Sequence, residues 1–237
     1  MYISTDLLKK ALYPYSIELS EEQLDKFDEF AYVLAEENKR INLTALTSPE
    51  DIAIKHFADS LALLRYAEVP QNSTLADVGT GAGFPGLALA IVRPDLSVTL
   101  FDSTKKKLAF VDSIIHRFSL NAKTVHLRAE EAGQEKSCRE KFDTATARAV
   151  AELNILAELC VPLVKIGGIF CPMKGALSEE ELTNGKRALG VLGAKTEKIE
   201  KYNLTTGDAR TIITAKKISQ TPTRFPRSFS GIKKNPL

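Results

Sequence analysis

The chain has 237 residues and a mass of 26.0 kDa, with 44% hydrophobic residues, 26% charged residues and a formal net charge of +2. This composition is typical of a folded globular protein and excludes a disordered or fibrous chain. The longest apolar run, Leu87–Val92, is far shorter than the roughly 20 residues that cross a bilayer. Cys138, Cys160 and Cys171 lack CxxC spacing, so we expect a cytoplasmic protein without disulfides, a metal site or membrane attachment.

The charges are distributed unevenly along the chain. Residues 1–72 carry a net charge of −6, residues 73–208 carry +1, and residues 209–237 carry +7 with no acidic residue. A basic terminal segment on a nearly neutral body is typical of proteins that bind a phosphate-bearing partner. A tail that only improves solubility would show the same charge pattern, so both interpretations stay open on charge alone.

The first 72 residues are predicted to form an N-terminal helical extension. Ser20–Gln23 fit a capping box that opens an amphipathic helix, and Ser48 and Pro49 suit the N-cap and first position of another helix. Pro70–Ser73 then breaks the helical spacing of the apolar residues. We therefore place the start of the next domain at residue 73.

Residues 73–217 alternate between short apolar strands and helices, which is typical of a doubly wound, mostly parallel α/β sheet covered on both faces. Strands are predicted at Thr74–Val78, Ser97–Phe101, Lys123–Leu127, Phe142–Ala147 and Gly168–Pro172, with helices at Phe84–Val92, Ser103–Phe118, Glu152–Val164 and Ser178–Leu192. Ala194–Tyr202 and Ala209–Lys217 are predicted to form an antiparallel pair that completes seven strands. Residues 218–237 are predicted to form a basic C-terminal arm, either a loop or an extended segment.

A glycine-rich segment directly follows the first predicted strand. Its three alternating glycines, Gly79, Gly81 and Gly83, allow tight backbone turns and close approach of a ligand. Residues 81–86 also satisfy the GxGxxG pattern of dinucleotide-binding loops, so a nicotinamide or flavin enzyme is one interpretation. Asp102 ends the second predicted strand, where a carboxylate can accept hydrogen bonds from both ribose hydroxyls of an adenosine. A methyltransferase would use this carboxylate in the same way.

Two observations favour S-adenosylmethionine over a dinucleotide as the ligand of this loop. Asp77 precedes the first glycine by two residues, which is typical of loops that receive the amino-acid end of S-adenosylmethionine and unfavourable beside a pyrophosphate. A compact nicotinamide reductase would need a Tyr-x-x-x-Lys pair, and none of the six tyrosines has a lysine four residues later. The sequence therefore predicts a methyltransferase.

The absence of two motifs limits which atoms could accept the methyl group. Enzymes that methylate exocyclic base amines carry an Asn/Asp-Pro-Pro-aromatic motif after the fourth strand, where this chain has Asp143–Arg148. Carbon-5 pyrimidine chemistry needs a nucleophilic cysteine, and none of the three lies in a proline-cysteine dipeptide. Guanine N7 needs neither device, because its in-plane lone pair attacks the methyl group directly and no proton has to be removed.

Ten segments along the chain together match one family. They are Asn38–Thr44, Lys55–Leu61, Asp77–Leu89, Phe101–Ser103, Lys105–Lys107, Arg128–Glu130, Ala147–Ala151, Lys174–Gly175, Phe225–Arg227 and Lys233–Leu237. Through them the sequence resembles, over almost its full length, the RsmG methyltransferases, also called glucose-inhibited division protein B. The resemblance implies a cytoplasmic, Rossmann-like enzyme, and we expect it to be a monomer. It would use S-adenosylmethionine to methylate guanine N7 at position 527 of 16S rRNA, in the 530 loop. Free RNA, a precursor particle and the assembled small subunit all stay open as the form of the substrate.

The resemblance also implies roles for individual residues. Gly79, Gly81, Gly83, Phe84 and Ser103 would line the cofactor loop, Asp102 would bind the ribose, Ala129 and Glu130 would lie against the adenine, and Arg148 would close the methionine end beside the target base. Arg148 is expected to orient the reactants, with no general base. The candidate RNA-binding residues are Asn38, Lys39, Asn42, His56, Lys174, Arg224, Arg227, Lys233 and Lys234.

Several of these residues have structural interpretations as well. Phe84 could be a core residue at a helix start, Glu130 could serve the first turn of a helix, and His56 could form a surface pair with Asp59 one helical turn away. Two other functions also stay open, a methyltransferase fold that acts on a small molecule and a binding module without activity. The uncompensated charges of the C-terminal segment argue against the small-molecule methyltransferase, which has no need of them.

Overall fold

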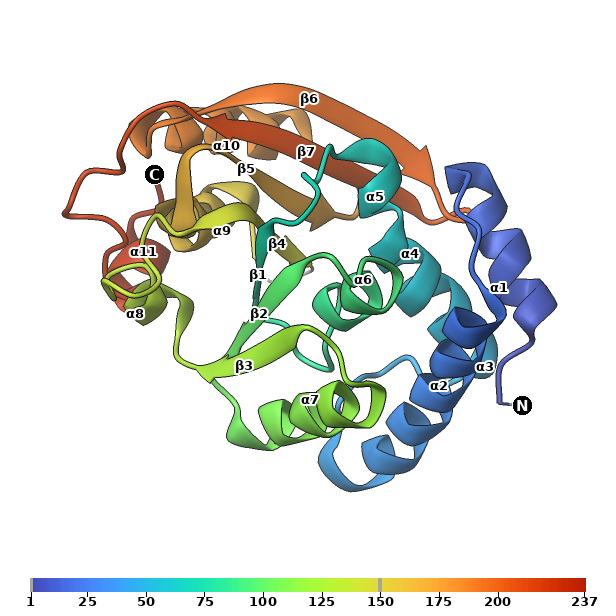
Figure 1. Ribbon diagram of the computed structural model, residues 1–237. Coiled ribbons are helices and arrows are strands. Elements are labelled where there is room, and N and C mark those ends of the chain that lie inside the picture. Colours follow the sequence, from blue (N-terminus) through green and yellow to red (C-terminus); the bar gives the residue numbers. More distant parts are fainter. Residues whose placement is uncertain (1, 149–150) are drawn as a thin grey trace.

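One sheet of seven strands organises the protein, and the computed structural model describes residues 2–148 and 151–237 (Figure 1). The strands are β1 (Thr74–Val78), β2 (Ser97–Asp102), β3 (Ala122–His126), β4 (Phe142–Arg148), β5 (Val164–Lys174), β6 (Ala194–Asn203) and β7 (Ala209–Lys217). Their order is β3-β2-β1-β4-β5-β7-β6, in which β1 to β5 pair in parallel and β7 is antiparallel to both β5 and β6. This arrangement confirms the predicted doubly wound, mostly parallel sheet.

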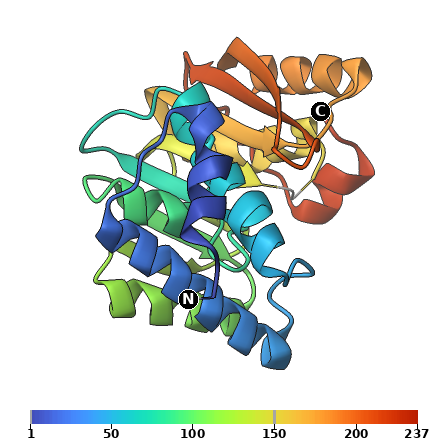
Figure 2. The ribbon, with the colours of Figure 1, turned by 90° about the vertical axis from the view of Figure 1, so that its right-hand side faces the viewer.

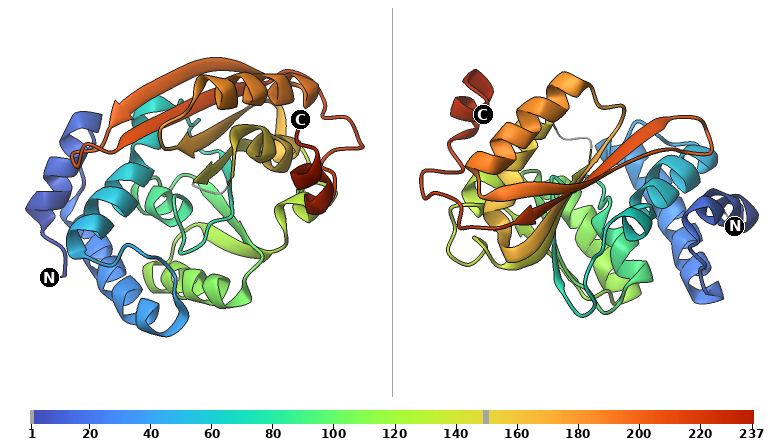
Figure 3. Two further views of the ribbon diagram at one scale, coloured as in Figure 1. Left: turned by 180° about the vertical axis from the view of Figure 1, so that it is seen from behind. Right: turned by 90° about the horizontal axis from the view of Figure 1, so that it is seen from above.

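Helices cover both faces of the sheet (Figures 1 and 3). One face carries α1 (Thr5–Leu12), η1 (Tyr13–Tyr15), α2 (Glu21–Ile41), α3 (Pro49–Asp51), η2 (Ile52–Ala58), α4 (Asp59–Leu61), α5 (Leu63–Tyr66), α6 (Gly86–Val92) and α7 (Lys105–Phe118). The other face carries α8 (Ala129–Ala132), α9 (Leu153–Cys160), η3 (Val161–Leu163), α10 (Glu179–Val191) and α11 (Phe229–Lys234). Among the described residues, no helix combines the length and the apolar character needed to cross a membrane.

The N-terminal helices belong to the same hydrophobic core as α6 and α7, beside which they lie in Figure 2. Phe27 and Phe30 of α2 contact Phe57, with ring centroids 4.7 and 5.4 Å apart, and Phe30 also stacks on Phe84 at 5.3 Å. Phe27, Phe30 and Phe57 are completely buried. Since burying such a side chain stabilises the fold by roughly 1.5–3 kcal/mol, the N-terminal helices are an integral layer of this domain.

The predicted helix starts are confirmed in the N-terminal region. The Ser20 hydroxyl accepts a hydrogen bond from the Gln23 backbone amide, and the Gln23 side chain accepts one from the Ser20 amide, which completes the capping box. Ser48 caps α3 in the same way, through the amide of Asp51. The helix after Ser48 is not uniform, however, because Ile52–Ala58 adopts the wider π-helical turn, a feature often found at functional sites.

Several predicted elements differ from the structure. The predicted helix Glu152–Val164 ends at Cys160, and the strand predicted at Gly168–Pro172 begins at Val164 and ends at Lys174. The helix expected from Phe84 begins at Gly86, because the preceding residues close a turn in which the Gly83 amide donates to the Thr80 carbonyl oxygen. The C-terminal segment was expected to be a loop or extended arm. Instead it packs on the body, with Phe225 and Ile232 buried and Phe229–Lys234 helical.

Candidate active site

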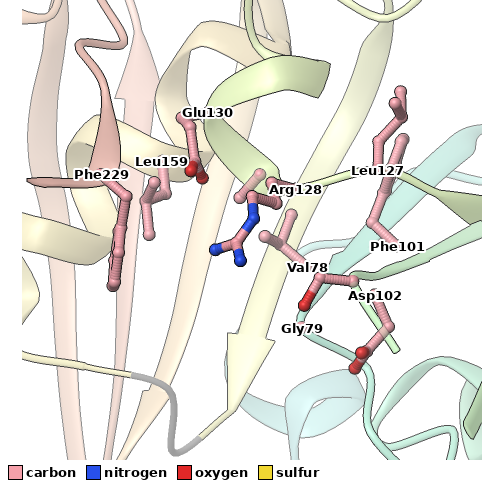
Figure 4. Close-up of a pocket in the computed structure, with 11 residues that line it drawn as sticks. Val78, Gly79, Phe101, Asp102, Leu127, Arg128, Glu130, Leu159 and Phe229 are labelled. Atoms are coloured by element: carbon pink, nitrogen blue, oxygen red, sulfur yellow. The ribbon is translucent and has the colours of Figure 1, made fainter. Parts of the chain in front are cut away.

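A pocket of about 150 Å³ lies at the carboxyl ends of β1, β2 and β3 (Figure 4). It is lined by Val78, Gly79, Phe101, Asp102, Ser103, Leu127, Arg128, Ala129, Glu130, Leu159 and Phe229. Figure 4 shows Phe229 and Leu159 on one side, Phe101, Leu127 and Asp102 on the other, and Arg128 between them. The carboxyl edge of a parallel sheet is where ligands bind in open α/β folds, and the pocket offers apolar walls with the carboxylates of Asp102 and Glu130. This combination fits an adenine ring with its ribose, and we call this cavity the adenosine-shaped pocket.

The glycines shape the loop that borders the pocket. Gly79, Gly81 and Gly83 have φ values of +71°, +58° and +97°, a region that other residues rarely adopt. A Cβ atom at Gly83 would lie 2.2 Å from Leu87 Cδ1, so this position also requires the small residue for packing. Gly81 and Gly83, which are predicted to bind the cofactor, do not line this pocket, and their backbone conformation explains why glycine stands at both positions. Gly79 itself lines the pocket.

Asp102 fixes the loop and faces the pocket at the same time. Its Oδ2 atom accepts a hydrogen bond from the Gly81 amide at 3.0 Å, and Oδ1 accepts one from the Thr104 amide at 2.8 Å. Each carboxylate oxygen can accept further hydrogen bonds, so the side chain could hold a ribose while it holds the loop. Ser103, Ala129 and Glu130, which are predicted to bind the cofactor, line the same pocket.

Asp77 lies beneath the glycine loop and not in the pocket. The residue is completely buried, and its Oδ2 atom accepts hydrogen bonds from the Thr80 hydroxyl at 2.6 Å and the Gly86 amide at 2.9 Å. Burial raises the pKa of this carboxyl group to about 6. The sequence predicts that Asp77 lies beside the amino-acid end of the cofactor. In the structure its hydrogen bonds to Thr80 and Gly86 instead stabilise the glycine loop.

Phe84 lies outside the adenosine-shaped pocket, in the core. Its ring is 4% exposed and stacks on the His56 ring with centroids 4.5 Å apart and an interplanar angle of 2°. The Arg148 guanidinium carbon lies 5.1 Å from the centroid of the Phe84 ring. Phe84 is therefore a core residue, as the alternative interpretation has it. Its ring contacts two residues of the region around Arg148, namely His56 and Arg148 itself.

Arg148, at the end of β4, is held by the π-helical segment. Its Nη1 atom donates to the carbonyl oxygens of Lys55 and His56 and to the Ser60 hydroxyl, at 3.1–3.2 Å. Its Nη2 atom donates to His56 Nδ1 at 3.1 Å, which leaves the His56 Nε2 proton for the Thr44 hydroxyl at 2.9 Å. Burial and the neighbouring Arg148 charge lower the pKa of His56 to about 3, so the ring is neutral. His56 was predicted to contact RNA, and the structure shows that both ring nitrogens already have protein partners.

A second pocket, of about 200 Å³, surrounds Arg148. It is lined by Leu46, Lys55, His56, Asp59, Arg148, Met173, Lys174, Gly175 and Arg210. Asp59 is the single acidic residue among four basic ones, and it pairs with Arg210 Nε at 3.1 Å and with Arg148 Nη1 at 3.6 Å. The alternative interpretation of His56 and Asp59 as a helix-surface pair does not hold, because both residues are buried. Lys55 also pairs with Asp51 and Asp208, and Lys174 pairs with Glu181, so carboxylates balance these charges. What the pocket offers a nucleotide is a group of cationic hydrogen-bond donors.

The remaining RNA-binding candidates of the N-terminal region and β5 lie in different surroundings. Asn38 closes its own loop, because its side-chain amide exchanges two hydrogen bonds with the Thr44 backbone. Lys39 and Asn42 are exposed, with Lys39 paired to Glu36. Lys174 lines the second pocket while its ammonium group pairs with Glu181 at 2.8 Å and donates to the Ala151 carbonyl oxygen. Ala149 and Val150, which belong to the matched segment Ala147–Ala151, lie outside the described residues.

The basic residues of the C-terminal segment fall into two groups. Arg224, Lys233 and Lys234 are exposed and stay candidates for RNA contacts. Arg227 instead pairs with Glu158, whose side chain is completely buried, at 2.6 Å. This pair raises the pKa of Arg227 above its usual range. Arg227 was predicted to bind RNA, but in the structure its charge neutralises the buried carboxylate of Glu158.

Several pocket residues were not predicted to form the site. Phe101, Leu127 and Leu159 were part of predicted apolar strands or helices, and Arg128 was only part of a matched segment. Strand-end positions could have indicated Phe101 and Leu127, because side chains at the carboxyl edge of a parallel sheet face the ligand. No local signal marks Phe229, which reaches the pocket only because the C-terminal segment packs against α9.

Comparison with known proteins agrees with this geometry. A family model described as rRNA small subunit methyltransferase G (GidB) matches residues 23–212. Ribosomal RNA small subunit methyltransferase G of Acetivibrio thermocellus is 47% identical over 225 residues, which cover 94% of this chain and 92% of that protein. The protein of the same name from Clostridium perfringens is 42% identical over 234 residues, or 98% of each chain.

Solved structures show the same fold at low sequence identity. The 16S rRNA (adenine(1408)-N(1))-methyltransferase of Catenulisporales acidiphilia, solved with cosubstrate SAM, has a TM-score of 0.53 and 14% identity. The match covers 70% of this chain and 91% of that chain, and it supports the Rossmann-like methyltransferase fold. The family match and the curated relatives, which span nearly the whole chain, go further. The chain belongs to the rRNA small subunit methyltransferase G family.

Proposed function

We propose that this methyltransferase transfers the methyl group of S-adenosylmethionine to guanine N7 at position 527 of 16S rRNA. The observation that carries the proposal is the presence of two different pockets, one lined by Gly79 and the other by Arg148, whose guanidinium carbon lies 5.1 Å from the Phe84 ring centroid. One has apolar walls and the Asp102 carboxylate, which suit an adenosine, and the other has the basic residues around Arg148, which suit a nucleotide of RNA. The methionine part of the cofactor would lie between them.

The residues present fit S-adenosylmethionine. The chemistry that this group supplies is a methyl on a positively charged sulfur, which makes the methyl carbon open to attack. In the proposed site Asp102 accepts the ribose hydroxyls, Gly79 leaves room for the ligand against the backbone, and Arg148 donates hydrogen bonds to the methionine carboxylate. Ala129 and Glu130 border the adenine.

The reaction needs no general base in this site. Guanine N7 presents a lone pair in the ring plane, which forms the new bond to the methyl carbon while the carbon–sulfur bond breaks and its electrons return to sulfur. The ring thereby gains the positive charge that the sulfur loses. His56 is neutral and has partners at both nitrogens, so the residues around Arg148 act by orientation and charge placement.

The RNA-binding surface would join the second pocket to exposed basic residues. Lys174 and Arg148 line the pocket, and Lys39 lies on the N-terminal region. Arg224 and the lysines of α11 would contact RNA phosphates farther from the target base. We propose a monomer that acts in the cytoplasm on 16S rRNA or on a precursor of the small subunit, where this substrate occurs.

The test uses methyl-labelled S-adenosylmethionine with 16S rRNA from small subunits that lack the modification. Label should appear at guanine 527, at a site that cleaves after reduction and aniline treatment, as 7-methylguanine does. A matched 530-loop RNA with 7-deazaguanine at the target should accept no label, because carbon replaces the reacting nitrogen. Equal labelling of both RNAs would exclude N7 chemistry, and label found only on a small molecule would support the alternative function.

A further inference from the structure

The C-terminal segment supplies one wall of the adenosine-shaped pocket. Phe229, the first residue of α11, lies beside Leu159 and across from Phe101 and Asp102 (Figure 4). Phe229 is half-buried and packs against the core cluster that contains Leu159. An aromatic ring at the edge of a pocket for adenine can stack on the base, which is a favourable and sequence-independent contact.

A buried ion pair fixes the segment just before Phe229. Arg227 Nε and Nη2 donate to the two oxygens of Glu158 at 2.8 and 2.6 Å, and the Arg227 backbone amide donates to Glu158 Oε1 at 2.9 Å. Glu158 is completely buried and precedes Leu159 of the pocket wall. Charge-assisted bonds in this two-pronged geometry are strong and directional. The pair therefore sets the position of Phe229 relative to Leu159.

The same guanidinium also reaches the far end of α11. Arg227 Nη1 donates to the Asn235 carbonyl oxygen at 3.0 Å, so one side chain contacts α9 and the residue that ends α11. Ser228 caps the first turn of α11 through the Gly231 amide. Upstream, Arg139 donates to the carbonyl oxygens of Thr221 and Phe225, both at 2.7 Å. The short helix is thus held at both ends and along its approach.

We propose that Phe229 contacts the adenine ring of the cofactor and that Glu158 and Arg227 are positioning residues for this contact. The inference rests on the proposed function, because it takes the pocket to bind S-adenosylmethionine. In this proposal the C-terminal segment is part of the cofactor site, whereas the basic residues of the segment by themselves indicate only RNA binding. Lys233, whose ammonium lies 5.5 Å from the Phe229 ring centroid, places an RNA candidate next to this wall.

The test is calorimetric titration of the full-length protein with S-adenosylmethionine and, separately, with adenosine. Phe229→Ala should weaken both ligands about tenfold, equivalent to about 1.4 kcal/mol, because the lost contact is with the base that both share. Phe229→Tyr keeps the ring and should restore affinity to within about twofold of the wild type. Equal affinities of Phe229→Ala and wild type for both ligands would overturn the proposal.

The positioning role is tested with Arg227→Lys, which keeps the charge for Glu158 but loses the two-pronged geometry. It should weaken S-adenosylmethionine about threefold in the wild type and have no further effect in Phe229→Ala, since the two changes act on one contact. An equal loss in both backgrounds would show a purely structural role and overturn this part of the proposal. Asp102→Ala separates the inference from the proposed function: if it weakens binding while Phe229→Ala does not, only the inference fails, and if neither does, the pocket assignment fails.

Discussion

Asp102 offers the sharpest test of the adenosine-shaped pocket, because its carboxylate has one measurable role in the fold and another toward the ligand. Asp102→Ala removes the acceptor for the Gly81 and Thr104 amides. Both hydrogen bonds lie at a partly exposed site, where water can replace the carboxylate, so we expect the free energy of unfolding to fall by only about 1 kcal/mol. The fold should therefore survive the substitution.

The effect on binding should be larger than the effect on stability. Two ribose hydroxyls would donate to the same carboxylate, and hydrogen bonds to a charged acceptor each contribute about 1.5–3 kcal/mol in protected sites. Because Asp102 is half-exposed, we expect a total loss of about 1–3 kcal/mol, or roughly a 5- to 150-fold weaker affinity. Distortion of the glycine loop would add to this loss for every ligand, whereas lost ribose contacts affect only ligands that carry the hydroxyls.

Titration calorimetry with adenosine and 2′,3′-dideoxyadenosine separates these two contributions. The wild type should prefer adenosine, and Asp102→Ala should bind both ligands with nearly equal affinity. Asp95→Ala is a matched control, since Asp95 also accepts a backbone hydrogen bond, from Asn72, but precedes β2 at the opposite edge of the sheet. It should leave the affinity for adenosine unchanged. An Asp102→Ala variant that still prefers adenosine by the wild-type factor would refute the ribose assignment.

Three further predictions follow from charges in and around the site. The single-turnover methylation rate should show no ascending limb between about pH 6 and 9, because N7 needs no base and the pKa of His56 is about 3. The pKa of Asp77 is raised to about 6, so the protonated carboxyl group stabilises the folded state and this stabilisation is lost as pH rises through 6. In urea unfolding, the free energy of unfolding of the wild type relative to Asp77→Asn should therefore fall by about 1 kcal/mol between about pH 5 and 8. Arg224→Gln with Lys234→Gln should lower the log–log salt slope of RNA binding by about 0.7–0.9 for each phosphate contact removed, whereas Lys10→Gln, on the acidic N-terminal region, should not change it.

The adenosine-shaped pocket was largely predictable because its residues follow strands in the sequence. Gly79, Asp102 and Ser103 come directly after or at the ends of β1 and β2, and Ala129 and Glu130 follow β3 after a short connection. The parallel arrangement of β1 to β3 brings these strand ends to one edge without further information. Local patterns predict Gly79 and Asp102 in this half of the pocket, whereas Ser103, Ala129 and Glu130 were expected there from the family resemblance.

The opposite wall could not be predicted, because it depends on long-range packing. Leu159 and Phe229 meet only when the C-terminal segment folds back on α9, and the basic composition of that segment indicated an exposed arm. One signal was present in the sequence of α9. Glu158 is the single charged residue within the otherwise apolar or neutral segment Leu153–Cys160, and a carboxylate in such a helix requires a cation. Arg227 is that cation, which removes it from the charges available to RNA.

Arg148 shows why the N-terminal helices belong to the reaction site and not to a separate module. The guanidinium donates to two backbone carbonyl oxygens and one hydroxyl in residues 55–60, and it pairs with Asp59. Its approach to Phe84 places the same group beside the glycine loop. Strand β4 positions the backbone of Arg148, but hydrogen bonds to residues 55–60 determine the orientation of its guanidinium group. The second pocket therefore exists only where both parts of the chain meet. If it receives the target nucleotide as proposed, recognition of the RNA depends on helices that precede the sheet in the sequence.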